Sequence, residues 1–593
     1  MDRRRRTAGD TRGTGGARAG TRAARPDGPG ARGITRRLFL NGSLKATLAA
    51  SLASHLSLGE LLAGQAGGGV RAAAARRYDG ELIEESYGLA HRLRDGLLAI
   101  PASLTPEGPL HDAIVLGGGV SGLMAAWELV RGGLSDVVLY EKEDYIGGNS
   151  RKSHANGTDY TCATWSVVRP KDPFLLRLFQ DLGVVQGIAA DGTPRIDPAL
   201  VGPGPDNNTL VDGTWYPGPS YGGDPAESIR RMPLSEKDRK DEIDFYRDMK
   251  TWAERRGRDG RPAFAMPVED GSRDADILEL DRITMLEYAR RKGWGPLALA
   301  EVDDWSTSDI GGQASEVSAY AFLSFNSLGQ GGEDITLPGG NTWLAERLTE
   351  RVGRDRTRTG LMAVRVENRG DEVRVTLVDP GTERFSARRA RCTVIACPKH
   401  ITGRMVPELA AAGRDAYLKF RYGALLMGAA SVKKTPRLKG APPAWFNAAD
   451  GRLIQGFLIA DYNSDRWRKG DPDRPNVLCL WAPLGGRATR ADLLTEPWSH
   501  WSDLMADDLE SMVPGISTDL TRLDIYVWGH HMVIPAPGFL TGDARRNLTR
   551  PLGRITFAHS DRNGMTSFEL ATRAGYDAAR EALGLVRGVP KET

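Results

Sequence analysis

The sequence predicts an α/β fold in which a parallel-sheet domain, assembled from separate pieces of chain, carries an inserted α+β domain. Three observations lead to this prediction. A strand–turn–helix–strand unit occupies residues 112–150, alternating strand patterns return in residues 337–400, and a strand–loop–helix pattern closes the chain in residues 553–583. Alternating strands and helices of this kind are typical of a parallel sheet covered by helices.

The N-terminal region differs in composition from the rest of the 593-residue chain. Residues 1–75 hold 13 Lys and Arg and 4 Asp and Glu, which leaves 66 basic and 72 acidic side chains beyond them. The mildly acidic remainder argues against nucleic acid as a partner. Residues 1–33 are rich in Arg, Gly and Ala without an apolar period, so we expect them to be disordered.

A targeting signal is predicted directly after this segment. Arg36 and Arg37 precede Phe39 and Leu40, which resembles a twin-arginine export signal and predicts a periplasmic or extracellular protein. The stretch 44–62 is too weakly apolar for a transmembrane anchor, and small residues at 72–75 suit signal cleavage. The alternative is a basic tail followed by an ordinary helix.

Residues 76–110 are interpreted as a leader segment, with a helix expected from Gly80 to Leu98. The unit that follows carries the strongest motif of the chain. The apolar run 113–116 predicts a buried strand, and Gly117, Gly119 and Gly122 form G-x-G-x-x-G after it. These glycines permit a tight turn, the approach of a pyrophosphate to the backbone, and close packing of helix on strand.

The next helix and strand complete a Rossmann-like nucleotide site. The helix begins near Val120 and directs its free N–H groups at the phosphates, while Glu141 ends the second strand (137–140) and suits a ribose hydroxyl. A carboxylate at this place would repel a 2′-phosphate. The motif therefore favours FAD or NAD over NADP, and its spacing does not separate the two.

The domain borders follow from the pattern changes. We assign residues 110–165, 335–400 and 545–593 to the nucleotide-binding domain, and residues 166–334 and 401–544 to the substrate-binding domain. Ser235 and Thr284 stand where helix N-caps are expected, and 361–366 with 373–378 alternate like a hairpin.

Gly147-Gly148 beyond the second strand resembles the two-glycine extension of the flavin-containing amine oxidase superfamily. The Pro-Gly-Gly-Asn segment at 338–341, the apolar strand ending at Pro398 and the closing residues 557–579 match in the same order. The nearest branch resembles exported bacterial spermidine dehydrogenase-like proteins. The resemblance implies FAD as the cofactor, in a Rossmann-like FAD-binding domain that carries the inserted domain.

The motif and the resemblance together imply a set of cofactor-binding residues. Within it, Val364 would contact adenine through its backbone, Ser560 and Asp561 would hold the ribityl chain or the pyrophosphate, and Phe568 and Glu569 would start the last helix at the flavin. For Glu569 the alternative is a partner of the helix dipole alone. The full set is Gly117, Gly119, Val120, Ser121, Gly122, Glu141, Lys142, Gly147, Gly148, Asn149, Ser150, Val364, Ser560, Asp561, Phe568 and Glu569.

Three positions depart from the pattern of many relatives. Asn149 stands where many have Arg, Met427 where a lysine below the flavin is expected, and Ser567 where an aromatic side chain encloses the amine. The last two departures give weight to a flavin-dependent desaturase or cyclase as the alternative function. A non-catalytic FAD-fold binding protein is a remote alternative, which the intact phosphate loop argues against.

The resemblance implies hydride transfer from a carbon α to an amine nitrogen to flavin N5, giving an imine that hydrolyses to an aldehyde. His530 and His531, with Trp528, are the candidate catalytic residues, because a histidine that titrates near pH 6.5 could take a proton from an amine. The alternative is a structural histidine bonded to a carbonyl. Asp303, Asp304 and Asp309 either attract a cation or form a solvated face.

The expected partners are a small-molecule substrate, with an amine as the first candidate, and an electron acceptor that is O2, a quinone or a cytochrome. The absence of a second G-x-G-x-x-G argues against a flavin monooxygenase or a disulfide reductase. No C-x-x-C pattern exists among Cys162, Cys392, Cys397 and Cys479, so no metal site is predicted and mostly buried free thiols are expected.

Overall fold

The part of the chain that can be described follows the N-terminal region. The computed structural model describes residues 78–170, 172–198, 200, 207–219, 224–265, 267–329, 334–413, 417, 420–438, 445–447, 452–461 and 473–587. The predicted export signal and the segment expected to be disordered lie outside these residues. Within the described ranges, no helix is long and apolar enough to cross a membrane.

The first of two large sheets has seven strands. Its parallel core pairs β12 with β3, β3 with β2, β2 with β15, and β15 with β21, and an antiparallel meander of β13 and β14 extends it. The strands are β2 (Pro106–Leu116), β3 (Val137–Tyr140), β12 (Thr357–Arg358), β13 (Met362–Arg369), β14 (Glu372–Val378), β15 (Phe385–Ile395) and β21 (Ile555–Phe557).

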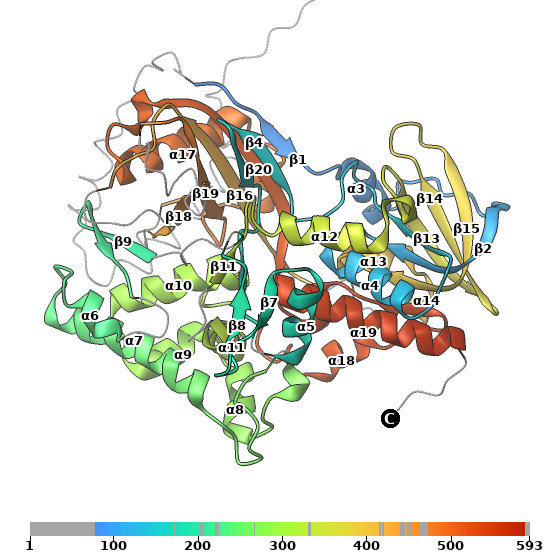
Figure 1. Cartoon of the computed structure of the whole chain (residues 1–593), viewed down its shortest axis with the longest axis horizontal. Coiled ribbons are helices and arrows are strands. Elements are labelled where there is room, and N and C mark those ends of the chain that lie inside the picture. The colour runs from blue at the N-terminus through green and yellow to red at the C-terminus, as the bar shows by residue number, and fades with distance from the viewer. Residues whose placement is uncertain are drawn as a thin grey trace, which may run out of the picture. The chain divides into compact units, whose positions relative to one another are not determined.

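Helices cover both faces of this sheet, and their packing explains its apolar strands (Figure 1). On one face, α4 (Val120–Arg131) packs against α19 (Phe568–Arg587) and α12 (Thr342–Val352). On the other face, α13 (Lys399–Met405) contacts α3 (Gly88–Arg94) and β13. The strands are therefore buried on both sides, as continuous apolar runs require.

The second large sheet has eight strands in the order β1-β20-β16-β19-β18-β17-β9-β10, and it is mainly antiparallel. Its strands are β1 (Leu82–Glu84), β9 (Asn207–Val211), β10 (Thr214–Pro217), β16 (Tyr422–Val432), β17 (Trp445–Asn447), β18 (Gly456–Ile459), β19 (Asn476–Pro483) and β20 (Leu520–Val533). Two-stranded ribbons complete the strands: β4 (Lys152–Ala155) with β5 (Thr158–Thr161), β6 (Ser166–Val168) with β11 (Asp334–Thr336), and β7 (Val185–Ile188) with β8 (Pro194–Ile196).

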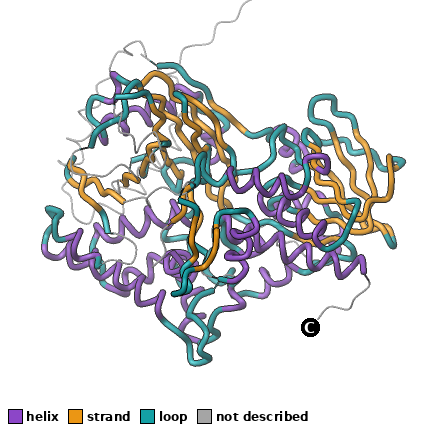
Figure 2. Tube along the Cα trace, viewed as in Figure 1, coloured by secondary structure: helices purple, strands orange, loops and turns teal. Residues whose placement is uncertain are grey.

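The remaining helices gather mainly below the eight-stranded sheet in the view of Figure 2. Five of them share a core rich in aromatic side chains. The helices are α5 (Pro173–Asp181), α6 (Pro225–Ile229), α7 (Glu236–Glu254), α8 (Ala275–Glu279), α9 (Met285–Lys292), α10 (Pro296–Ile310), α11 (Ala319–Gly329), α14 (Glu408–Ala411), α16 (Arg490–Leu493), α17 (Trp498–Met512) and α18 (Asp543–Thr549).

Local predictions from capping residues are confirmed. The Ser235 side chain accepts a hydrogen bond from Asp238 N at the start of α7, and Thr284 accepts one from Glu287 N at the start of α9. Gly293 ends α9 in the left-handed conformation. Each cap satisfies an N–H or C=O group that the helix itself leaves unpaired.

The prediction for the segment after residue 78 was wrong. The expected helix from Gly80 to Leu98 is a strand, β1, followed by the shorter helix α3. Leu82 and Ile83 pair with Ile525 and Tyr526 of β20, so a sheet edge far along the chain decides the local structure. Intrinsic helix preference is weak enough for such pairing to override it.

The four cysteine thiols are unpaired, and three of them are buried. Cys392 lies on β15, whereas Cys397 follows the end of that strand. Burial raises the pKa of the Cys162, Cys392 and Cys397 thiols to about 12. These thiols are therefore protonated and unreactive at neutral pH.

Candidate functional site

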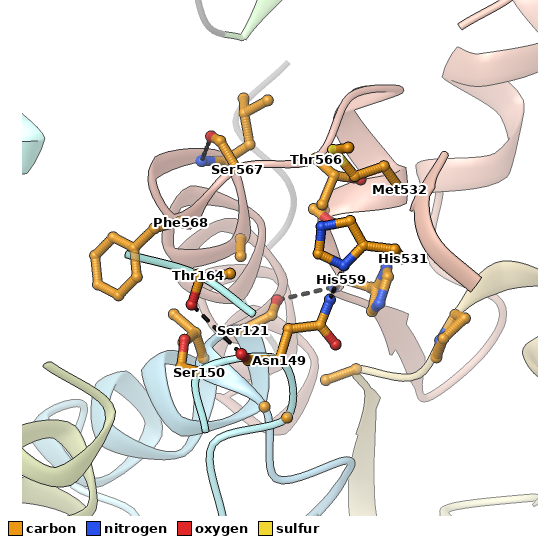
Figure 3. Close-up of a pocket in the computed structure, with 18 of the residues that line it drawn as sticks. Ser121, Asn149, Ser150, Thr164, His531, Met532, His559, Thr566, Ser567 and Phe568 are labelled. Carbon is orange, nitrogen blue, oxygen red and sulfur yellow. Dashed lines mark hydrogen bonds between the residues drawn. The ribbon is translucent and has the colours of Figure 1, made fainter. Parts of the chain in front are cut away.

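One cavity of about 1110 Å³ runs from the carboxyl ends of β2 and β3 to the inserted domain. The first turn of α4, the first turn of α19 and the end of β20 all contribute to its wall. Figure 3 shows this convergence, with Ser121, Asn149, His531 and Phe568 around one space. The carboxyl edge of a parallel sheet is where nucleotide ligands bind in such folds.

The two glycine motifs form one cradle. Gly147 N donates to Gly118 O at 2.9 Å, and Gly119 forms an isolated parallel β-bridge with Gly147. A Cβ atom on Gly148 would lie 3.1 Å from Gly119 Cα, and one on Gly122 would lie 1.9 Å from Gly117 O. Only glycines permit these approaches, and they leave backbone exposed to the cavity for a pyrophosphate.

The start of α4 supplies the donors for this cradle. Gly119 caps the helix without any side-chain hydrogen bond, so the first N–H groups remain available at the cavity. Val120 and Ser121 line the cavity, whereas Gly122 faces the turn that it packs against. Gly575 of α19 allows close helix contact here, because a Cβ atom would lie 2.2 Å from Ser121 O.

Glu141 lies where the motif predicts, at the end of β3 and on the cavity wall. Its carboxylate accepts from Gly118 N at 2.6 Å and from Glu143 N at 2.9 Å. Burial raises the pKa of this carboxyl, and these two hydrogen bonds oppose the rise. The bonds orient both oxygens, each of which keeps a lone pair for a ribose hydroxyl.

Lys142 and the segment before α3 close the cavity beside Glu141. Lys142 forms an ion pair with Glu143, whose carboxylate also accepts from Ser86 N and Ser86 Oγ. Glu85, Tyr87 and His91 line the cavity as well. The sequence analysis missed these residues, because no local motif marks a strand that crosses to another domain.

The first turn of α19 forms another wall. Ser567 Oγ accepts from Leu570 N at 3.2 Å, so Ser567 is a helix cap. Phe568 and Glu569 line the cavity. The Glu569 carboxylate accepts from Val168 N at 2.9 Å, and burial raises its pKa. This hydrogen bond links β6 to the start of α19. Glu569 therefore does more than interact with the helix dipole, which was the alternative expected from the sequence.

Besides Gly122, two predicted cofactor residues lie outside the cavity wall. Val364 is buried in β13, and Leu361, Met362 and Ala363 line the cavity in its place. Ser560 lines the cavity, but Asp561 lies behind it and accepts a hydrogen bond from Lys399 N. The predictions of direct contact for Val364 and Asp561 are therefore not supported by the geometry.

His531 is part of the cavity wall, and burial makes it a weaker base than an exposed histidine. Asn149 Nδ2 lies 3.3 Å from His531 Nδ1, and the ring packs edge-on against Trp481 with centroids 5.6 Å apart. Burial lowers the pKa of His531 to about 4. The ring is therefore neutral, and the expectation of a base titrating near pH 6.5 was wrong because burial disfavours the imidazolium.

The other two catalytic candidates differ in whether they line the cavity. His530 lines the cavity and stacks on His400 with ring centroids 4.4 Å apart, and burial lowers its pKa to about 3. Trp528 does not line the cavity, since its indole N–H donates to Cys162 O at 2.8 Å. Trp528 is a structural residue of the sheet.

A pair of tryptophans was missed by the sequence analysis. Trp165 and Trp481 line the cavity with ring centroids 5.3 Å apart and a 39° tilt. Trp481 Nε1 donates to Ser308 Oγ at 2.9 Å, and Asp309 and Asn326 lie on the same wall. The two indoles are more than 300 residues apart in the chain, so no sequence pattern joins them.

The other positions singled out as departures also have defined places. Met427 pairs with Trp481 across the sheet but is buried at 1 % exposure and does not line the cavity. Asp303 accepts from Ala314 N, and Asp304 forms an ion pair with Arg487. Asp303 and Asp304 therefore form neither a solvated face nor a group that attracts a cation. Among the described residues, no group of His, Cys, Asp and Glu could hold a metal ion.

Comparison with known proteins agrees with this architecture. The sequence profile of the flavin-containing amine oxidoreductase family matches residues 120–583. Flavin-containing amine oxidase A of Sus scrofa is 23 % identical over 518 residues, covering 82 % of this chain and 87 % of that protein.

Solved structures show the same fold. A double mutant of putrescine oxidase superposes with a TM-score of 0.60 at 18 % identity, covering 80 % of this chain and 99 % of that one. Cyclohexylamine oxidase from Brevibacterium oxydans gives 0.59 at 17 % identity, covering 81 % and 100 %. The predicted α/β fold class, an FAD-binding domain with a substrate-binding domain, is confirmed.

The glycine cradle, the acid at the end of β3 and the family match point to one cofactor. The residues present fit FAD, because Gly119 lines the cavity and a Cβ atom there would meet only Gly148 Cα, at 3.9 Å, so it would occupy the space left for the diphosphate. The protein is therefore an FAD-dependent oxidoreductase, and the chain belongs to the flavin-containing amine oxidoreductase family.

Proposed function

We propose that the protein oxidises an amine at the carbon α to nitrogen, giving an imine that hydrolyses to an aldehyde. Bound FAD supplies the hydride acceptor, flavin N5. The observation that carries the proposal is the group formed by Trp165, Trp481, His531 and Asn149 on one cavity wall. It stands next to the cradle and the start of α19, where the resemblance implies the flavin ring.

The walls of this region favour a neutral amine. A protonated amine has no lone pair to stabilise the cation that develops as hydride leaves. The indole rings and the neutral imidazole of His531 offer no anion to hold a proton on the substrate. Desolvation by these walls lowers the pKa of a bound ammonium group, in the same way as it lowers that of a buried lysine.

His531 acts as a positioning residue in this proposal. Asn149 Nδ2 donates to Nδ1, so the ring hydrogen is on Nε2. Trp481, which is itself held by Ser308 Oγ, restricts rotation of the ring. A ring fixed in this way can orient a substrate by one donated hydrogen bond.

The remaining roles complete the proposal. Glu141 binds the adenosine ribose, the Gly117–Gly122 turn with Gly147 and Gly148 holds the diphosphate, and Ser560 contacts the ribityl chain. Support comes from their places on the cavity wall. Export to the periplasm or beyond rests on Arg36-Arg37 in the sequence, and O2, a quinone or a cytochrome would reoxidise the flavin.

The test is anaerobic mixing of purified protein with an amine panel while flavin absorbance is followed. We expect bleaching of the oxidised flavin bands by a diamine, a polyamine or an alicyclic amine, with aldehyde as the product. Bleaching by no amine would overturn amine oxidation and favour the desaturase or cyclase. Trp481→Phe is the matched variant: it keeps the ring packing, so the reduction rate at saturation should change little while the KM rises.

A further inference from the structure

His559 adopts a backbone conformation that suits glycine. Its φ is 75° and its ψ is 146°, and it joins β21 to the short 3₁₀ turn Ser560–Asn563. Three other described residues besides glycine have positive φ: Asn156, Asp212 and Glu383. These three do not line the cavity, whereas His559 does. Strain of this kind persists only where surrounding contacts enforce it, and it concentrates at functional sites.

Contacts to the FAD cradle enforce the conformation. His559 N donates to Ser121 Oγ at 2.8 Å, and Ser121 lies in the first turn of α4 (Figure 3). Ala558 N, one residue earlier, donates to Ile395 O at the end of β15. The strained residue is therefore bonded directly to the helix turn whose N–H groups face the diphosphate.

The ring of His559 is oriented from behind. Asp561 N donates to His559 Nδ1 at 3.2 Å, so a neutral ring carries its hydrogen on Nε2. A protonated ring also carries a hydrogen there. The hydrogen bonds recorded for this ring all involve Nδ1, and Nε2 is thus the polar atom left to a ligand in the cavity.

A buried carboxylate backs the ring. Asp561 Oδ2 accepts from Lys399 N and Tyr422 OH, while Oδ1 has no hydrogen-bond partner and lies 3.2 Å from His559 Nδ1. Burial alone would raise the pKa of Asp561, but the His559 ring and these donors hold it well below its usual range. The carboxylate is charged and can pair with a protonated ring.

We propose that His559 is a diphosphate-binding residue, whose Nε2–H donates to the FAD phosphates held at the start of α4. The glycine cradle itself, residues 117–122 and 147–150, contains no cation. A histidine backed by a carboxylate supplies a donor that gains charge when the ring is protonated. The strain at His559 is retained for this contact. The proposal rests on FAD as the cofactor and is independent of the substrate.

The experiment separates strain from phosphate binding. Apoprotein is titrated with ADP and with adenosine by calorimetry, for the wild type and for His559→Gly. We expect the glycine variant to bind ADP about tenfold more weakly, the loss of one hydrogen bond to a charged group. Adenosine affinity should be unchanged, since adenosine lacks phosphates.

Glu383→Gly is the matched control. Glu383 also has positive φ, at 52°, but it lies on the β14–β15 hairpin and does not line the cavity. Glu383 also pairs with Arg92, so this variant loses a surface ion pair together with the strain, and its ADP affinity should be unchanged. Equal ADP affinity of wild type and His559→Gly would overturn the proposal, as would an equal loss for ADP and adenosine.

A second readout needs no glycine variant. The imidazole N–H resonances of ¹⁵N-histidine-labelled apoprotein are recorded as ADP or adenosine is added, with His559→Asn to assign the signal. Asn keeps a side-chain acceptor for Asp561 N. We expect ADP alone to shift the Nε2–H signal of His559, and a signal that moves with neither ligand would contradict the proposal.

Discussion

Lys399 offers the sharpest quantitative test of the structure. Its side chain is fully buried beneath the cofactor cavity, and Nζ donates to Ala558 O at 2.6 Å. Burial lowers the pKa of this amine from 10.5 to about 8, against the opposing charge of Asp561. The perturbation is Lys399→Met, which has similar length and no charge.

The size of the effect follows from linkage. A shift from 10.5 to about 8 corresponds to a cost of about 3 kcal/mol for folding with a charged Lys399. Because the folded pKa lies below the unfolded pKa, the folded state binds fewer protons. The cost is complete below about pH 7 and fades as pH rises towards 10.5. Between pH 7 and pH 9 the wild type should gain about 1 kcal/mol relative to the variant.

The assay is urea unfolding of the apoproteins at both pH values. The difference in unfolding free energy between wild type and Lys399→Met cancels the other titrating groups, which the two proteins share. The lost bond to Ala558 O costs the variant about 1 kcal/mol at either pH and does not alter the slope. A difference that stays constant from pH 7 to pH 9 would refute the reasoning, since the amine would then titrate as in the unfolded chain.

Three further predictions concern the site. In His531→Gln, kcat/KM should fall, but the midpoint of its rise with pH between pH 6 and pH 9 should not move, because burial keeps the imidazole neutral. A shifted midpoint in steady-state assays would show that His531 is the titrating base. In Gly122→Ala, FAD content by absorbance should be lost, because Cβ would lie 1.9 Å from Gly117 O, whereas Gly88→Ala meets nothing within 4 Å and should keep its FAD. In Glu141→Gln, the side-chain NH2 group would face the N–H group of Gly118 or of Glu143, and two donors cannot form a hydrogen bond with each other. The affinity for FAD, measured by fluorescence quenching, should therefore fall about tenfold or more.

The parts of the site that were predictable are those whose chemistry is local. Gly117, Gly119, Gly122 and Glu141 lie within one strand–turn–helix–strand unit, so spacing along the chain translates directly into geometry. Gly147-Gly148 adds a second local signal that proves to contact the first. Helix caps such as Ser235 are local in the same sense.

The parts that were not predictable depend on distant segments. Trp165 meets Trp481, and Ser86 meets Glu143, only because two sheets bring their strands to the same cavity. The state of His531 depends on burial, which sequence spacing does not report, so its base strength was overestimated. Val364 was placed too far along β13, since Leu361, Met362 and Ala363 line the cavity and Val364 does not.

The pairing of β1 with β20 also sets a limit on how the N-terminus can be processed. Leu523 N donates to Asp79 O, and a Cβ atom on Gly80 would lie 2.0 Å from Leu523 O. The chain is therefore packed against β20 from Asp79 onward. A peptidase that cuts before Arg76 would leave three residues ahead of this point. Any cut beyond Gly80 would unpair a strand at the edge of the sheet and expose the backbone of β20 to another chain. Recombinant versions of the protein that begin later than Tyr78 should therefore tend to aggregate.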